Sequence, residues 1–240
     1  SARSTESLDI HMPHHGSIYN SYEATHKEVH KRALQEIIDI VLKHMVDYDF
    51  WCGRNQFSID FTPKPAISIR RTWNYDRDPE SANKNPLDTT SYGHNIELIW
   101  LLNRAYEVLG LPPAREFTRK FADYTLANGW DNIHGGIYRD GMHDGRIVVT
   151  DKEWWQNFES LTGFLDSYQA TEDERYLDTF IKLWEFDKKY FYNPEVGESR
   201  QLLLADGTPV IDDTGNQWKC IYHTDRAMME CCLRIESLTE

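Results

Sequence analysis

Residues 91–113 read SYGHNIELIWLLNRAYEVLGLPP, and this stretch decides the fold. From His94 onward, apolar residues recur at the three- and four-residue spacing of an α-helix, until Gly110 ends the run. Pro112 and Pro113 then open a second run of the same kind. Two helices joined by so short a turn form a helical hairpin. The apolar positions are Ile96, Ile99, Trp100, Leu102, Ala105 and Leu109 in the first helix, and Phe117, Phe121, Tyr124 and Leu126 in the second.

The same helical pattern recurs along the rest of the chain. Between the helices lie short segments rich in Gly and Asp, which we expect to form small strands or hairpins at a rim. The units repeat about every 60 to 80 residues, a spacing typical of helical-hairpin arrays. The sequence therefore predicts an all-α fold, either a solenoid or a closed toroid, with short rim strands. The further predicted helices cover 25–45, 152–170, 176–190 and 223–238, and the rim segments are 53–61, 135–141 and 198–209.

Residues 62–90 break this pattern. The segment is rich in Pro, Asn, Asp and Arg, and it contains Trp73 and Tyr75. A segment of this length without helical periodicity is typical of either a functional loop or a disordered one. We favour the first of these, an ordered flap that covers an active site.

Composition and charge exclude several classes of protein. The chain has 240 residues, which fits one domain spanning 1–240, and its 26 basic and 39 acidic residues give a net charge of −13. Such an acidic chain is a poor match for a nucleic-acid partner. No apolar run is long enough to span a membrane, and the four cysteines show no CxxC spacing, so we expect a cytoplasmic protein with reduced thiols. An aromatic content of 13 %, with eight Trp, is a first indication of sugar binding.

Three polar clusters lie at predicted helix starts, where the helices of a toroid point into a central pit. In the first, His94 and Glu97 are three residues apart and share one helical face. A histidine beside a carboxylate is suited to act as a general base with an orienting partner. The alternative is a helix cap with a Glu that interacts favourably with the helix dipole.

The second and third clusters combine indoles with polar side chains. In DKEWWQNFE (151–159), an indole followed by Gln156, Asn157 and Glu159 is suited to stack on a sugar and bind its hydroxyls. Trp154 and Trp155 face about 100° apart on a helix, so we expect one of them in the core. The third cluster, in 217–232, comprises Trp218, Tyr222, His223 and Arg226.

No metal or cofactor is expected. His26 and His30 have the i, i+4 spacing of metal ligands, but no HExxH motif or carboxylate cluster accompanies them. The sequence also has no GxGxxG, P-loop or GxSxG motif, so neither nucleotide chemistry nor serine hydrolysis is indicated.

Together the three clusters resemble the N-acylglucosamine 2-epimerase superfamily, which includes cellobiose 2-epimerases and mannose-type aldose–ketose isomerases. The resemblance lies in GHNIE followed by LIWLL, in DKEWW with a Glu four residues after its second Trp, and in WKxxYHxxR, over residues 91–238. It implies an (α/α)6 barrel that moves a proton at C2 of a reducing sugar, with no metal or nucleotide.

The resemblance also implies roles for individual residues. His94 and His223 correspond to the two acid/base histidines, and Glu97 to the carboxylate that follows the first of them. Two histidines on different helices can reach opposite faces of C2, which would invert that carbon through a cis-enediol(ate). Proton transfer on one face would instead give aldose–ketose isomerisation. The implied substrate-binding residues are Trp155, Trp218, His11, Tyr222 and Arg226.

The chain is too short for a complete barrel of six hairpins. Six hairpins of about 60 residues need about 350 to 400 residues, so we expect the C-terminal part of the barrel, as a fragment or as a short form completed by another subunit. A homo-oligomer is therefore left open. The loop at 62–90 is longer than in cellobiose-type enzymes.

The rival functions are a catalytically silent sugar-binding protein and a glycoside hydrolase using Glu97 and Glu159.

Overall fold

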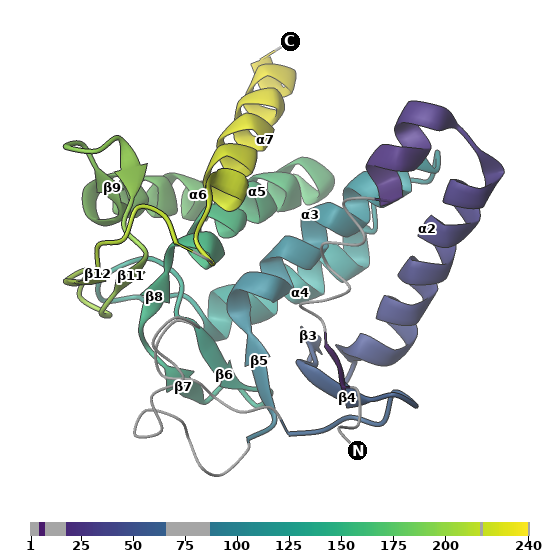
Figure 1. Ribbon diagram of the computed structural model, residues 1–240, viewed down its shortest axis with the longest axis horizontal. Coiled ribbons are helices and arrows are strands. Elements are labelled where there is room, and N and C mark those ends of the chain that lie inside the picture. The colour runs from purple at the N-terminus through teal and green to yellow at the C-terminus, as the bar shows by residue number, and fades with distance from the viewer. Residues whose placement is uncertain (1–4, 8–17, 66–86, 217, 240) are drawn as a thin grey trace.

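The computed structural model describes residues 5–7, 18–65, 87–216 and 218–239, and it is built mainly from helices (Figure 1). The hairpin expected from residues 91–113 is present as α3 and α4, and α5 and α6 form a second hairpin. The α/α arrangement predicted from the sequence is confirmed. The helices are α2 (Glu28–Ile40), α3 (Tyr92–Val108), α4 (Arg115–Asn128), α5 (Trp154–Thr171), α6 (Glu174–Phe186) and α7 (Ile221–Thr239), and residues 18–25 are also helical.

Two of these helices end in a single π-helical turn. The turn η1 (Val41–Met45) continues α2, and η2 (Asp187–Phe191) continues α6. The helices predicted over 25–45 and 176–190 therefore exist, and the sequence pattern did not reveal the wider winding of their last five residues.

The strands are short and form small antiparallel sheets at one end of the helices (Figure 1). Strands β5 and β8 lead directly into α3 and α5, so the rim sheets fix where these two helices begin. The sheets comprise β1 (Thr5–Ser7) with β4 (Gln56–Ser58), β2 (Val46–Asp47) with β3 (Cys52–Gly53), β5 (Thr89–Ser91) with β6 (Asp140–Met142) and β7 (Ile147–Val149), β8 (Lys152–Glu153) with β11 (Leu202–Leu203) and β12 (Pro209–Ile211), and β9 (Tyr192–Asn193) with β10 (Glu198–Ser199).

Two sequence expectations change at the rim. Residues 152–153 were expected to begin a helix, but they pair with Leu202 and Leu203 as a strand, so α5 starts at Trp154. Most of the flap expected at 62–90 lies outside the described residues, and its last two residues, Thr89 and Thr90, belong to β5.

The core is centred on the close packing of α3 against α5. Two glycines permit this approach. A Cβ on Gly163 of α5 would lie 2.1 Å from Cγ2 of Ile96, and a Cβ on Gly93 of α3 would lie 2.4 Å from Cγ of Gln156. Both contacts are far shorter than van der Waals distance, so larger side chains would push the two helices apart.

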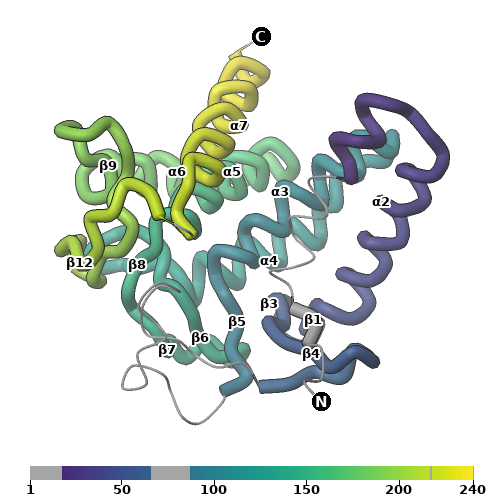
Figure 2. The backbone as a smooth tube through the Cα atoms, viewed as in Figure 1, coloured from purple at the N-terminus to yellow at the C-terminus, as the bar shows by residue number. Residues whose placement is uncertain are grey.

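Helix α7 packs on α5 along one side only. Ala227 and Cys231 are buried on that side, whereas Met229 and Leu233 are 66 % and 60 % exposed. Its C-terminal half projects beyond the other helices (Figure 2). None of the helices in the described part of the chain has the length and apolar character needed to cross a membrane.

Candidate active site

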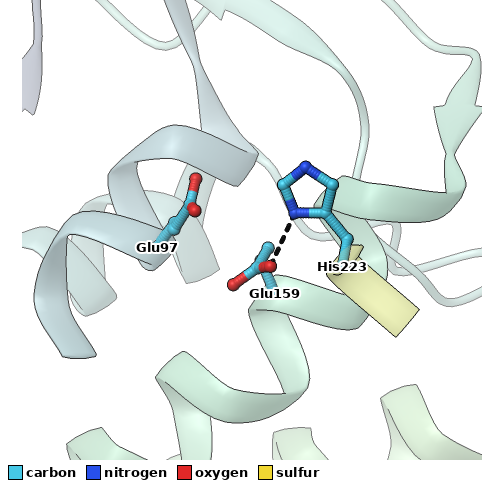
Figure 3. A group of neighbouring side chains, drawn as sticks. All are labelled: Glu97, Glu159 and His223. Carbon is cyan, nitrogen blue, oxygen red and sulfur yellow. Dashed lines mark hydrogen bonds and ion pairs between the residues drawn. The ribbon is translucent and has the colours of Figure 1, made fainter. Parts of the chain in front are cut away.

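Three helices contribute one side chain each to a buried polar cluster near their N-terminal ends (Figure 3). Glu97 comes from α3, Glu159 from α5 and His223 from α7. One nitrogen or oxygen atom of each lies within 4.8 Å of the others. Glu159 is fully buried and Glu97 is 5 % exposed, so both carboxyl groups are almost completely removed from water.

Arg226, on α7, connects the two carboxyl groups. Its Nη2 lies 2.6 Å from Oε1 of Glu97 and 2.6 Å from Oε1 of Glu159. Glu159 has two further partners: Nδ1 of His223 lies 2.7 Å from Oε1, and the indole nitrogen of Trp100 donates to Oε2 at 3.1 Å. Glu159 thus interacts with three nitrogen groups, whereas Arg226 is the one described hydrogen-bond partner of Glu97.

This difference in hydrogen-bond partners separates the acidities of the two glutamates. Burial raises the pKa of Glu97, and the neighbouring charge of Glu159 raises it further, against the opposing charge of Arg226. Burial would also raise the pKa of Glu159, but the bond with His223 and the charge of Arg226 lower it below its ordinary value. The pair is therefore arranged so that Glu97 keeps its proton to a higher pH than Glu159 does.

The guanidinium of Arg226 is held in place by aromatic rings. Its Cζ lies 4.1 Å from the ring centroid of Tyr222 and 5.0 Å from that of Trp100, and Nη1 donates to the hydroxyl of Tyr222. The two rings and two carboxyl groups fix a cation at the centre of the cluster.

The donor types of the cluster also suit a metal ion. Within the described ranges, Glu97, Glu159 and His223 are the one set of three His, Cys, Asp or Glu side chains whose donor atoms come this close, and His26 and His30 are not in it. The guanidinium, however, already lies between the two carboxylates where a metal ion would have to bind. The residues therefore fit a resident arginine better than a metal.

A second group of contacts brings the two predicted acid/base histidines onto one aromatic surface. The ring centroid of Trp155 lies 4.6 Å from that of His94, on α3, and 5.5 Å from that of His223. The two imidazole centroids can therefore be no farther apart than these separations together, about 10 Å. Trp154 is 4 % exposed, as expected for the core member of the indole pair.

The remaining predicted site residues are Tyr222, Trp218 and His11. Tyr222 is 43 % exposed but contacts both Arg226 and His223. Trp218 precedes α7 and is 45 % exposed. His11 lies outside the described residues.

Sequence reasoning missed a repeat that the structure makes visible. The first six residues of α3, α5 and α7 are YGHNIE, WWQNFE and IYHTDR. His94, Gln156 and His223 occupy the third position, and Glu97, Glu159 and Arg226 the sixth. Asn95 and Asn157, both at the fourth position, accept hydrogen bonds from rim backbone N–H groups, of Gly53 and Ile137 respectively. Aligning the helix starts would have found this signal.

Comparisons with known proteins identify the family of this chain. The chain matches the sequence profile described as N-acylglucosamine 2-epimerase over residues 7–227. The chain belongs to the N-acylglucosamine 2-epimerase family. It is 34 % identical over 153 residues to a cellobiose 2-epimerase of Ruminococcus albus, a match covering 61 % of this chain and 38 % of the relative. It is 29 % identical over 144 residues to an N-acylglucosamine 2-epimerase of Mus musculus, covering 58 % and 34 %.

Solved structures show the same fold. A sugar epimerase from a ruminal bacterium superposes with a TM-score of 0.78 at 22 % identity, covering 95 % of this chain and 54 % of that chain. A cellobiose 2-epimerase from Spirochaeta thermophila superposes with a TM-score of 0.77 at 24 % identity, covering 98 % and 54 %. The chain therefore spans about half the length of these structures, and its matches span less than half of the curated relatives.

Proposed function

We propose that the chain carries the proton-transfer machinery of a sugar epimerase acting at C2 of a reducing sugar. One observation carries the proposal: the imidazoles of His94 and His223 both contact the indole of Trp155, beside a buried pair of glutamates with separated acidities. A sugar stacked on the partly exposed indole would lie beside both imidazoles. Family membership supports the same chemistry.

The geometry supports specific roles for the two histidines in this reaction. Nδ1 of His223 faces the ionised Glu159, so this nitrogen carries a proton and Nε2 is the nitrogen left for the substrate. After the sugar ring opens, one imidazole removes the C2 proton, and the electron pair forms a cis-enediol(ate) with the C1 carbonyl. The other imidazole donates a proton to the opposite face of C2, which inverts the carbon and restores the carbonyl.

The glutamates complete the proposed mechanism. Glu159 holds His223 in one tautomer and one orientation. Glu97, the carboxyl group of the pair with the raised pKa, can exchange a proton with a sugar oxygen while negative charge develops on the enediolate, and Arg226 stabilises that charge electrostatically. No step requires a metal or a nucleotide. The names of the relatives suggest cellobiose and N-acylglucosamine as substrates to test first, with mannose as the test of aldose–ketose isomerisation.

The glutamate geometry argues against the rival hydrolase. Retaining glycosidases place their two carboxyl groups about 5 to 5.5 Å apart and inverting enzymes about 6.5 to 9.5 Å apart, on either side of a glycosidic bond. Here donor oxygens of Glu97 and Glu159 lie within 4.8 Å of each other and share one guanidinium nitrogen, which leaves no room for a sugar between them.

The four free cysteines support the further proposal of a cytoplasmic location.

Incubation with cellobiose, N-acetylglucosamine or mannose in deuterated water tests the proposal. Deuterium at C2, read by NMR, supports it, whereas cleavage of a glycosidic bond would identify a hydrolase and binding without exchange a silent binding protein. We expect His94→Ala and His223→Ala each to abolish exchange and to retain the fold. His134→Ala, at an exposed turn, is the matched control and should exchange at the wild-type rate. Full exchange in either site variant would refute the two-histidine mechanism.

A further inference from the structure

Glu153 is a buried carboxylate just outside the cluster described above. It is the second residue of β8, it immediately precedes α5, and it is 2 % exposed. A side chain at this position usually caps the helix, as Ser91 does when it accepts from the backbone N–H of His94 at the start of α3. The side chain of Glu153 makes no such cap. Its Oε2 instead accepts a hydrogen bond from the indole nitrogen of Trp155 at 2.5 Å.

A buried carboxylate of this kind needs a nearby cation. Nε of Arg139 lies 3.6 Å from Oε1 of Glu153, and the Arg139 side chain is only 6 % exposed. The backbone carbonyl of Arg139 accepts from the backbone N–H of Tyr92 and from the side-chain amide of Gln156, each at 3.3 Å. Tyr92 begins α3 and Gln156 lies in the first turn of α5. The rim segment that carries this cation, which also lies 3.4 Å from Asp140, therefore contacts the starts of both helices as well.

The bond to Glu153 determines how the indole of Trp155 is rotated. A charge-assisted hydrogen bond is short and directional, so it selects one orientation of a ring that could otherwise turn about its side-chain bonds. That ring contacts His94 at 4.6 Å and His223 at 5.5 Å between centroids, at interplanar angles of 47° and 40°. Rotation of the indole would change both contacts at once.

We propose that Glu153 is a positioning residue that, through the indole of Trp155, sets the placement of His94 and His223 relative to each other. Its effect passes through the indole N–H of Trp155, which donates to its carboxylate. The proposal rests on the proposed function for its catalytic consequence, but the geometric claim stands on its own contacts.

A double-mutant cycle separates this role from a merely structural one. Glu153→Leu removes the acceptor, Trp155→Phe keeps an aromatic ring but removes the N–H donor, and the double variant removes both. We expect Glu153→Leu to lower the rate of C2 exchange about 10- to 100-fold, mainly through kcat, because misplaced catalytic groups cost that much. In the Trp155→Phe background the same change should cost less than about twofold. Equal losses in both backgrounds would overturn the proposal.

Nuclear magnetic resonance provides a readout that does not depend on activity. The indole N–H of Trp155 should shift upfield in Glu153→Leu, and the ring-proton shifts of His94 and His223 should both change with it because they sense the ring current of the indole. Glu153→Gln keeps an acceptor oxygen, and it provides a second test if the leucine variant does not fold. It should retain the bonded indole resonance and at least about a third of the exchange rate.

These two readouts fail separately. If wild-type protein exchanges no deuterium with any sugar, the proposed function is wrong, and the indole and imidazole resonances still decide whether Glu153 positions the rings. If those resonances are the same in wild type and Glu153→Leu, the positioning role is wrong even when exchange is observed.

Discussion

Helix α7 carries two arginines, eight residues apart, whose side chains are 15 % and 11 % exposed, and each belongs to a charge cluster beside Trp100. The Cζ atoms of Arg226 and Arg234 lie 5.0 Å and 5.8 Å from the ring centroid of this indole. We call them the proton cluster and the lock cluster. The proton cluster comprises Arg226, Glu97, Glu159 and His223, and the lock cluster comprises Arg234, Asp166, Glu230 and Asn103.

The two clusters use the same kinds of group for different purposes. In the lock cluster, Arg234 binds Asp166 at 3.1 Å and also pairs with Glu230, while the amide of Asn103 donates to Asp166 at 2.6 Å. These contacts join α3, α5 and α7, and among the described residues no imidazole takes part in them. In the proton cluster, two carboxylates compete for one guanidinium beside a histidine. The two clusters therefore differ in that the carboxyl groups of the proton cluster have unequal numbers of partners and lie next to an imidazole.

Loss of either arginine tests the comparison with the largest expected effect. Arg226→Met and Arg234→Met should each lower the free energy of unfolding by about 3 to 5 kcal/mol, because each leaves buried carboxylates without their cation. Only Arg226→Met should also abolish C2 exchange at temperatures where the variant is folded. Urea unfolding and the deuterium assay measure the two effects. Loss of exchange in both variants at full folding would show that the lock cluster is also catalytic.

The pH dependence of stability separates the two glutamates. The pKa of Glu159 is lowered, so its contribution is present above the ordinary value of 4.5 and is lost as pH falls through the lower folded value. The pKa of Glu97 is raised, so its ionisation costs stability as pH rises from 4.5 through the higher folded value. The free energy of unfolding of Glu159→Gln should therefore lie below that of wild type, and the difference should be largest, about 3 kcal/mol, near neutral pH. The free energy of unfolding of Glu97→Gln should increase relative to that of wild type as the pH rises from 4.5.

Urea unfolding between pH 3 and 8 measures both trends. The lock cluster offers the control. Asp166→Asn should lower the free energy of unfolding but leave the C2 exchange rate of the folded protein unchanged. Parallel pH trends for Glu97→Gln and Glu159→Gln would contradict the proposed separation of their acidities.

A smaller effect is expected from the indole between the clusters. Trp100→Phe keeps a ring under both arginines but removes the N–H that donates to Glu159. We expect a loss of about 1.5 to 3 kcal/mol in stability, as for other hydrogen bonds to a charged group, and a higher pKa for Glu159. Trp154→Phe is the matched control, because its buried indole N–H has no hydrogen-bond partner among the described residues. A similar change in both variants would mean that the N–H of Trp100 does not stabilise the glutamate.

The smallest effect is expected at the outer edge of the lock cluster. Glu230 pairs with Arg234 one turn away on the same helix and its side chain is 24 % exposed. Glu230→Gln should cost less than about 1 kcal/mol, since partly exposed ion pairs contribute little. Thermal unfolding measures the cost, and C2 exchange should be unchanged. A larger loss would show that Arg234 depends on Glu230 as much as on Asp166.

The sequence predicted the helices because their apolar residues follow a helical period over many turns. It predicted that His94, Glu97 and His223 matter, because they stand at helix starts within recognisable motifs. It did not predict that Arg226 joins Glu97 to Glu159, because residues 129 and 67 positions apart meet only through helix packing. Glu153 carried no signal, since a carboxylate before a helix is ordinarily read as a cap. The π-helical ends and the strand at Lys152 depend on tertiary contacts that periodicity does not record.

The separation of the two acidities is tested most directly by a carbon-13 NMR titration of the side-chain carboxyl groups of Glu97 and Glu159 in the wild-type protein. Single Glu→Gln variants assign the two resonances. We predict that Glu159 titrates below its ordinary value and Glu97 above it, with the lower transition moving when Trp100 is replaced by Phe. Two carboxyl groups that titrate together, or Glu97 titrating first, would contradict the proposed arrangement of the site.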